Sequence, residues 1–335
     1  MLKLANNTDS IANIYVGYSH DANAQFTAVV KASFAFTAEG EVKSIAAVPL
    51  QDSDEWCGPP HFSSLTASGE IMPFKEGAEI LLSGSVFPPE NKYHVMDISL
   101  GLQHDKINWQ KNLRLFGNRR WERHGLHYQP SHPEFLTPIE LSYENSFGGV
   151  CPYRSDQSYT ANPAGKAFLT REKDWELVQL PSIEYANNLL EKPGQQVMPA
   201  GFGAIPLQWS PRTPKLKKEQ FASLDGGRHP ENLKLPLNFY NIAPEDQRFK
   251  NKFVGGELIK LRGLIKNVEI GKIVELKIPQ IKFYAELSSA NNIQVNFNCD
   301  TLLIDIDTQQ FHLIWRAAIT AHLIKKNSWL SIDLI

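Results

Sequence analysis

Hydrophobic and polar residues alternate along several stretches of the first 116 residues. In FTAVVKASFAF, every even position from Phe26 to Phe36 is apolar, and polar residues such as Lys31 fall between them. This period of two predicts a β-strand over residues 26–36. The same alternation runs through residues 96–102 and 107–115, and a short polar stretch joins the two runs. The pattern therefore predicts a β-hairpin.

The C-terminal part of the chain shows the same behaviour. Apolar residues alternate in four further runs, at 281–287, 295–299, 302–306 and 311–317. Polar residues typical of a turn separate the last two runs, and alternation with one apolar face is typical of antiparallel sheets. The predicted fold class is therefore mainly β, with two antiparallel, sandwich-like β-sheet modules over residues 1–116 and 251–335.

The middle region, residues 117–250, has no sustained helical or strand period. Fourteen of the 21 prolines lie in it, and Pro and Gly interrupt its short apolar runs. We expect an irregular connecting region that packs on the sheets through large apolar side chains. The expected anchors are Trp121, Phe135, Tyr143, Phe147, Phe168, Trp175, Phe202 and Trp209. Short helices are expected near residues 215–223 and from Pro244, where a proline followed by acidic residues suits a helix start.

Charge and hydropathy exclude some classes of partner. The chain has 34 Lys and Arg against 36 Asp and Glu residues, which gives a net charge of −2. Without an excess of positive charge, nucleic acid is a poor candidate ligand. No apolar run approaches the roughly 18 to 20 residues that cross a bilayer, and the N-terminal residues lack the pattern of a secretory leader. We therefore expect a cytoplasmic protein that binds neither nucleic acid nor membranes.

Histidines form the densest group of candidate metal ligands. His124, His127 and His132 lie in HGLHYQPSH, but a glycine and two prolines argue against a helix there, and no HExxH pattern is present. A polar loop is the simpler interpretation, and a metal-dependent hydrolase that uses His124 to His132 stays open as an alternative. The chain contains no GxSxG nucleophile elbow, and its three cysteines are far apart in sequence. We therefore assign no catalytic residue, no metal and no cofactor.

One stretch, RLFGNRRWER at residues 114–123, is both cationic and aromatic. Arg and Trp are enriched at binding hot spots, so this stretch is a candidate contact surface for an acidic partner. The structural alternative is that Trp121 is packed in the interior and that the arginines pair with internal carboxylates such as Glu122 or cap irregular backbone carbonyls of the middle region. Both interpretations stay open at this point.

Several motifs in a fixed order resemble the DUF2169 family. They are RLFGNRRWER (114–123), PIELSYENSFGG (138–149), NPAGKAF (162–168), LPSIEY (180–185), PAGFGAIPLQWSPR (199–212), NFYNIAPEDQR (238–248), GGELIKLRGL (255–264) and DTLLIDIDTQQFHLIWRA (300–317). The resemblance covers roughly residues 10–317. Members of this family are found with bacterial type VI secretion systems, where they are regarded as adaptors or chaperones for toxin effectors.

The resemblance implies a non-enzymatic cytoplasmic adaptor. It would bind a cognate effector, through the effector's N-terminal region, and help to load it onto the VgrG spike or a PAAR-type tip protein. The few residues after 317 lead us to expect no fused PAAR domain, so these partners would be separate chains. The family offers no catalytic residue to carry over. The candidate partner-binding residues that lie in its motifs are Arg119, Arg120, Trp121, Arg123, Phe147 and Phe202.

Overall fold

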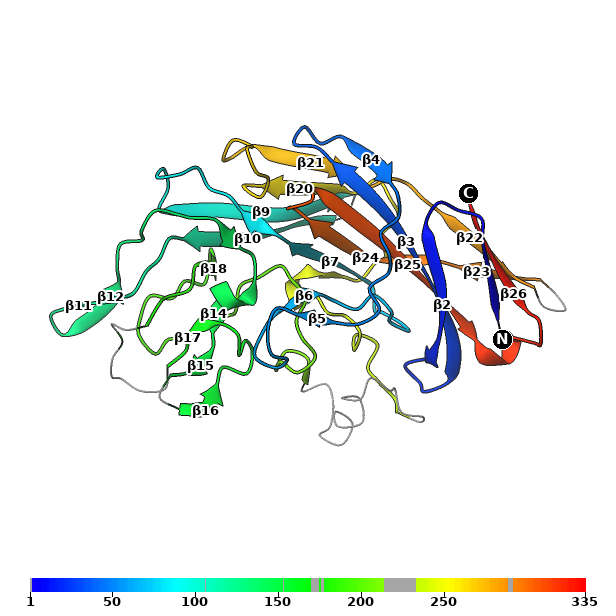
Figure 1. Ribbon diagram of the computed structural model, residues 1–335, viewed down its shortest axis with the longest axis horizontal. Helices are drawn as coiled ribbons and strands as arrows, with labels where there is room; N and C mark the ends of the chain where they lie inside the picture. The colour runs from blue at the N-terminus through cyan, green and yellow to red at the C-terminus, as the bar shows by residue number, and fades with distance from the viewer. Residues whose placement is uncertain are drawn as a thin grey trace.

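Two large β-sheets carry most of the secondary structure in the computed structural model, which describes residues 2–105, 107–152, 154–169, 175, 178–213, 233–288 and 292–335 (Figure 1). The first sheet is mixed and has the order β19-β7-β24-β25-β3-β2, with β4 paired to β3. Its strands are β2 (Ile11–Tyr18), β3 (Ala24–Phe36), β4 (Val42–Ile45), β7 (Ala78–Ser83), β19 (Arg248–Phe249), β24 (Asn298–Asp305) and β25 (Gln310–Thr320).

The second large sheet is antiparallel throughout and has the order β18-β10-β9-β20-β21. Its strands are β9 (Val95–His104), β10 (Ile107–Phe116), β18 (Ile183–Tyr185), β20 (Leu258–Arg262) and β21 (Ile273–Lys277). A four-stranded sheet joins the two chain ends in the order β1-β26-β22-β23. Its strands are β1 (Lys3–Asn6), β22 (Phe283–Leu287), β23 (Ile293–Asn296) and β26 (Trp329–Leu334).

The remaining strands form five two-stranded ladders. They are β5 (Glu55–Trp56) with β6 (Leu65–Ala67), β8 (Ser85–Val86) with β13 (Ile139–Glu140), β11 (Trp121–His124) with β12 (His127–Pro130), β14 (Phe147–Gly148) with β17 (Lys166–Ala167), and β15 (Val150–Cys151) with β16 (Arg154–Ser158). The 3₁₀ turns with described bounds are η1 (Tyr143–Asn145), η4 (Glu245–Gln247) and η5 (Ala321–Leu323). The mainly β prediction is therefore confirmed. No helix in the described residues is long and apolar enough to cross a membrane.

The predicted hairpins are present with short connections. In the first, Ile107 of β10 lies opposite His104 of β9. In the second, Asp305 of β24 lies opposite Gln310 of β25, and the Asp305 carboxylate accepts hydrogen bonds from the turn amides. The helix predicted from Pro244 is the single 3₁₀ turn η4. The helix predicted near 215–223 lies outside the described residues.

Strand pairing crosses the predicted module boundaries. β3 pairs with β25, β7 pairs with β24, and β9 pairs with β20. Residues 1–116 and 251–335 therefore share both large sheets and do not build one sheet module each. Alternation along a strand specifies which face is buried, but it does not specify the neighbouring strand.

One hydrophobic core spans both large sheets and the four-stranded sheet. The apolar face of β3 meets β25 in this core, where the rings of Phe34 and Phe311 stack with centroids 5.0 Å apart. The middle region has a second, smaller core of its own around Trp121, Phe147 and Trp175. Six of the eight predicted anchors are buried and Phe168 is half-buried, but Phe135 is 45% exposed and stacks on His94.

The other face of the seven-stranded sheet carries several charged side chains among apolar ones, and it is buried as well. Lys31 of β3 is 3% exposed, and its Nζ lies 2.6 Å from Oε1 of Glu70, in the irregular segment that covers this face. Arg316 of β25 forms an ion pair with Asp300 and donates a hydrogen bond to the carbonyl oxygen of Glu70 at 2.6 Å. These buried charges are paired, as buried charges must be if the fold is to tolerate them.

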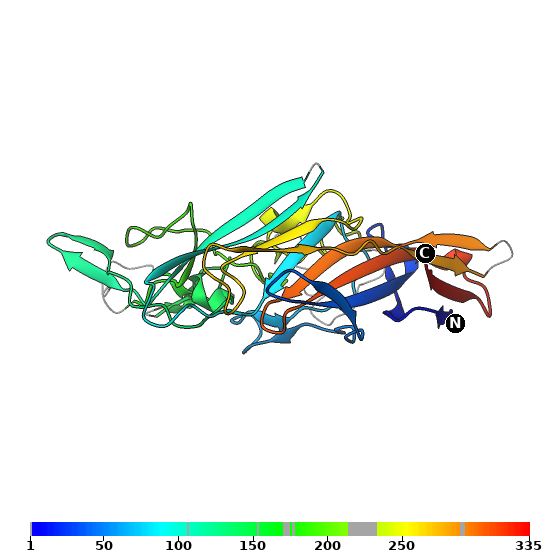
Figure 2. The same ribbon diagram turned by 90° about the horizontal axis from the view of Figure 1, so that it is seen from above.

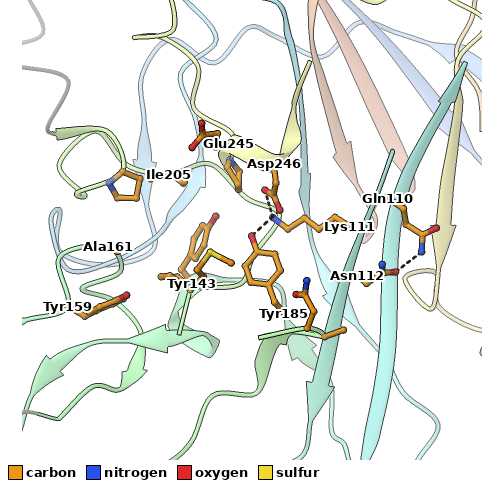
Figure 3. A pocket seen from close by; sticks show the side chains of 16 residues that line it. Gln110, Lys111, Asn112, Tyr143, Tyr159, Ala161, Tyr185, Ile205, Glu245 and Asp246 are labelled. Atoms are coloured by element: carbon orange, nitrogen blue, oxygen red, sulfur yellow. Dashed lines mark hydrogen bonds and ion pairs between the residues drawn. The ribbon is translucent and has the colours of Figure 1, made fainter. Parts of the chain in front are cut away.

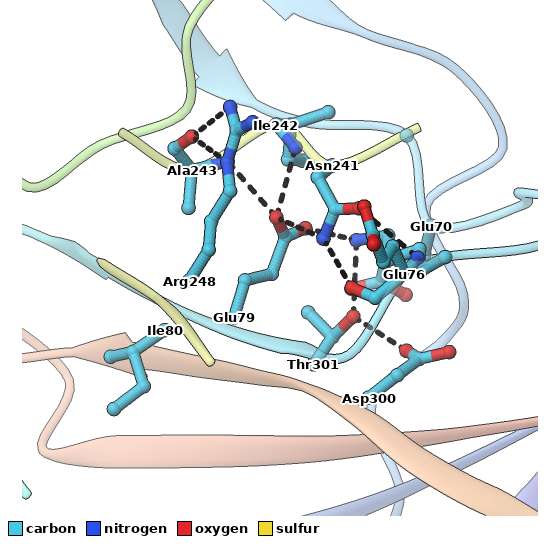
Figure 4. A network of polar contacts seen from close by, with 12 residues as sticks. Glu70, Glu76, Glu79, Ile80, Asn241, Ile242, Ala243, Arg248, Asp300 and Thr301 are labelled. Atoms are coloured by element: carbon cyan, nitrogen blue, oxygen red, sulfur yellow. Dashed lines mark hydrogen bonds and ion pairs between the residues drawn. The ribbon is translucent and has the colours of Figure 1, made fainter. Parts of the chain in front are cut away.

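Glu79 of β7 is the centre of the polar network on this face (Figure 4). Its carboxylate forms an ion pair with Lys75. Its Oε2 atom accepts hydrogen bonds from the backbone amides of Ile242 at 3.0 Å and Ala243 at 3.2 Å, and from the Asn241 side chain at 3.2 Å. Burial alone would raise the pKa of Glu79, but Lys75 and these donors hold it below its usual range. A charged carboxylate therefore fixes the irregular segment 241–243 to the sheet.

We expect Glu79→Ala to lower the free energy of unfolding by about 3 to 5 kcal/mol, because it leaves Lys75 buried without its partner. Urea unfolding measures the change. Glu275→Ala is the matched control, since it breaks the exposed Lys260–Glu275 pair at 3.4 Å and should cost less than about 1 kcal/mol. Equal effects of the two substitutions would contradict this role of Glu79.

Candidate binding site

A cleft of 860 Å³ opens where β10 and the end of β18 meet the irregular middle region (Figure 3). Its walls come from six separate segments of the chain. The lining residues are Gln110, Lys111, Asn112, Tyr143, Tyr159, Ala161, Tyr185, Ala186, Asn187, Met198, Pro199, Ile205, Pro211, Pro244, Glu245 and Asp246. The size of the cleft, and its mixture of apolar walls with a few polar groups, are typical of a binding site.

Lys111 of β10 lies at the base of this cleft, and Figure 3 shows its side chain directed toward Asp246 and Tyr185. Its Nζ lies 3.0 Å from Oδ1 of Asp246 and donates to Oε1 of Gln247 at 2.7 Å. It also lies 5.0 Å from the centroid of the Tyr185 ring, within range of a cation–π contact. The Tyr185 hydroxyl donates to Oδ2 of Asp246 at 3.1 Å. Asp246 therefore connects β10, β18 and η4.

Burial decides the protonation of the groups at the base of the cleft. It lowers the pKa of Lys111 to about 8, although Asp246 favours the charged form. Burial, followed by the charge of Asp246, raises the pKa of Tyr143 and of Tyr185. At neutral pH the two tyrosines are therefore uncharged hydrogen-bonding groups, and Lys111 is largely protonated.

Three of the six predicted partner-binding residues lie in the interior of the middle region. Trp121 is 1% exposed and packs with Phe147 in the smaller core. Arg119 is buried, forms an ion pair with Glu184 and donates to the carbonyl oxygen of Pro181 at 2.8 Å. The structural interpretation of the RLFGNRRWER stretch thus holds for Trp121 and Arg119. Arg119 both pairs with an internal carboxylate and caps a backbone carbonyl of the middle region, but the carboxylate is Glu184 and not the example Glu122, which is nearer in sequence.

The other three predicted residues lie elsewhere. Phe202 is fully buried behind the cleft, with its ring centroid 5.6 Å from Nζ of Lys111. Arg120 and Arg123 are exposed at the base and on the first strand of the β11–β12 hairpin. Figures 1 and 2 show this hairpin projecting from one end of the molecule, opposite the end that holds both termini. The structure therefore does not gather the six residues into one surface.

The histidine segment does not form a cluster. His124 and His127 face each other across the hairpin and are exposed, while the His132 ring packs against His94 with centroids 4.8 Å apart. Within the described part of the chain, no group of three or more His, Cys, Asp or Glu side chains is placed to hold a metal ion. The hydrolase alternative therefore receives no support from the geometry.

Lys111 is not among the predicted site residues, although the pattern of β10 contains a signal for it. Alternation in β10 runs through Ile107, Trp109, Leu113 and Leu115, and Lys111 occupies the one position on that face where an apolar residue is missing. A lysine on a buried face needs a partner, and its partner lies 135 residues further along the chain, in the APEDQR motif. Sequence alone could flag this lysine but could not name Asp246.

The lowered pKa of Lys111 makes stability depend on pH. The unfolded chain binds a proton at this lysine up to about pH 10.5 and the folded chain only up to about pH 8, so this group makes the folded state more stable as pH rises through that window. The stability of the wild type relative to Lys111→Met should increase by up to about 3 kcal/mol between pH 7 and pH 10.5. Urea unfolding across this range measures the difference. If the stability difference between wild type and Lys111→Met does not change with pH, burial does not lower the pKa of Lys111.

Comparison with known proteins places the chain in a family. No curated protein and no solved structure matches it. A family model, DUF2169, described as an uncharacterized protein conserved in bacteria, matches residues 21–316. The match takes in β3 to β24 and most of β25, and so all the residues that line the cleft. Motif order and family model agree, and the chain belongs to the DUF2169 family.

Proposed function

We propose that this protein is a type VI secretion adaptor that binds a cognate toxin effector and promotes its loading onto the VgrG spike or a PAAR-type tip protein. The observation that carries the proposal is the DUF2169 match over residues 21–316, together with the association of this family with type VI secretion that the motifs imply. An adaptor acts in the cytoplasm by binding and needs no catalytic group.

Two separated surfaces support a role that requires contact with more than one chain. The β11–β12 hairpin extends from one end of the molecule and carries exposed Arg120, Arg123 and Leu126, the last of which is 89% exposed. An exposed leucine at the tip of a hairpin that also carries two exposed arginines suits a partner surface with an apolar patch and acidic side chains beside it. The cleft beside β10 is the second surface.

Deletion of the gene tests the adaptor function. The tube protein should still reach the culture supernatant, because an adaptor is not part of the machine, whereas the cognate effector should be absent from it. Quantitative immunoblots of both proteins measure this outcome, and a pull-down of the effector on the purified adaptor should give a dissociation constant of about 1 μM or lower. Loss of the tube protein as well, or unchanged effector export without binding, would contradict the proposal.

Charge reversal tests whether the β11–β12 hairpin contacts the partner. Arg120→Glu and Arg123→Glu should weaken capture of the partner, and the difference from wild type should shrink as salt rises, since exposed charges are screened over about 8 to 10 Å. Lys277→Glu, at an exposed position on β21, is the matched variant that should leave capture unchanged.

A further inference from the structure

The edge of β10 beside the cleft is only partly paired. β10 pairs with β9 along its full length, from Ile107 to Phe116, but with β18 only over Leu113–Leu115. One further bond, from the Ala186 amide to the carbonyl oxygen of Asn112 at 3.3 Å, continues that pairing. Among the described residues, no strand pairs with Ile107–Lys111 on the side away from β9. Half of a ten-residue strand therefore has an open edge.

The cleft lies against this open edge. Gln110, Lys111 and Asn112 are consecutive, and their side chains point alternately to opposite faces of the sheet, yet all three line the cleft. One cavity can contact all three only if it borders the edge of the strand. In an antiparallel strand, residues i and i+2 direct their backbone amide and carbonyl groups to the same side. The carbonyl of Asn112 points toward Ala186, on the side away from β9. The amide and carbonyl of Gln110 therefore point to that side as well, into the cleft.

An open strand edge in a cleft has the geometry for strand addition by an extended peptide. The peptide backbone would pair with Gln110, and its alternate side chains would reach apolar wall residues such as Tyr159, Met198 and Ile205. Residues 107–112 would pair with a segment of about 20 Å. Lys111 points into the sheet's buried face, and an inward-pointing charge on an edge discourages indiscriminate strand pairing.

Charge at the rim specifies the peptide further. Lys111 already compensates Asp246, but Glu245 is exposed and has no ion-pair partner among the described residues. The charged residues that line the cleft are Lys111, Glu245 and Asp246, so the lining carries a net charge of −1. A basic side chain next to the apolar positions would pair with Glu245 and lie close to the tyrosine rings.

We propose that the cleft binds an extended peptide segment by strand addition to β10, and that this segment combines alternating apolar residues with a lysine or arginine opposite Glu245. That the segment belongs to the effector rests on the function proposed above.

A displayed library of random dodecapeptides, selected on the full-length protein, tests the binding mode without knowledge of the effector. We expect selected peptides to alternate apolar residues and to contain a basic residue, and to protect the Gln110 amide from hydrogen exchange. Gln110→Pro removes that amide and should weaken binding about tenfold, the effect of losing one hydrogen bond. Gln110→Ala keeps the amide and should bind as wild type does.

A second pair of variants blocks the cleft and controls for surface charge. Met198 is 58% exposed in the cleft. Ile273 is 48% exposed on β21, which is the edge strand of the β10 sheet on the side away from the cleft. Met198→Arg should abolish peptide binding and Ile273→Arg should not. Glu245→Gln should remove the preference for a basic residue. Failure to select any peptide, or binding that Gln110→Pro and Met198→Arg leave unchanged, would overturn the inference.

The effector pull-down separates this inference from the adaptor proposal. If Met198→Arg loses the effector as well as the peptide, the cleft is the effector site. If it loses the peptide but retains the effector, the assignment of the segment to the effector is wrong. If wild type retains no effector, the adaptor proposal fails, while the peptide experiments still decide whether the cleft binds an extended segment.

Discussion

Buried carboxylates that accept main-chain hydrogen bonds hold the irregular half of this protein to its sheets. A chain without regular structure pairs only part of its backbone with itself, and each buried amide left unpaired costs about 1 to 3 kcal/mol. Glu79 of β7 accepts the amides of Ile242 and Ala243, and Glu184 of β18 accepts the Leu190 amide at 2.7 Å. Each carboxylate is balanced by a buried cation, Lys75 for Glu79 and Arg119 for Glu184. Arg119, which lies in one of the family motifs, thus has a structural role as the partner of Glu184.

The position of the cleft follows from this arrangement. Glu79 fixes segment 241–243, and η4 follows directly after it. Gln247 of η4 donates to the carbonyl oxygens of Ile80 at 2.7 Å and Phe202 at 2.9 Å, and accepts from Lys111. These contacts place Asp246 over Lys111, and they hold the middle region at a fixed distance from the open edge of β10. The position of this wall of the cleft therefore depends on the buried Glu79 carboxylate, which fixes the segment that leads into η4.

The pattern of the sequence predicted local structure well and long-range structure poorly. Period-two alternation located β3, β9, β10, β24 and β25, because alternate residues of a strand face the core and this pattern can be read from a short stretch of sequence. Pairing between strands that are distant in sequence, such as β3 with β25, cannot be read from the pattern of a single sequence. The ion pairs show the same limit. The sequence pattern predicts an internal carboxylate for the arginines of residues 114–123, but it does not identify Glu184 as the partner of Arg119 or Asp246 as the partner of Lys111, because both partners are distant in sequence.

Native-state hydrogen exchange of the amides of Leu190, Ile242 and Ala243 tests most directly whether carboxylates lock the irregular chain to the sheets. If they do, these three amides exchange only through global unfolding, with the same opening free energy and denaturant dependence as the amides of β3 and β25. Exchange at a much lower free energy that does not change with denaturant would show local opening of the middle region. That result would contradict the account.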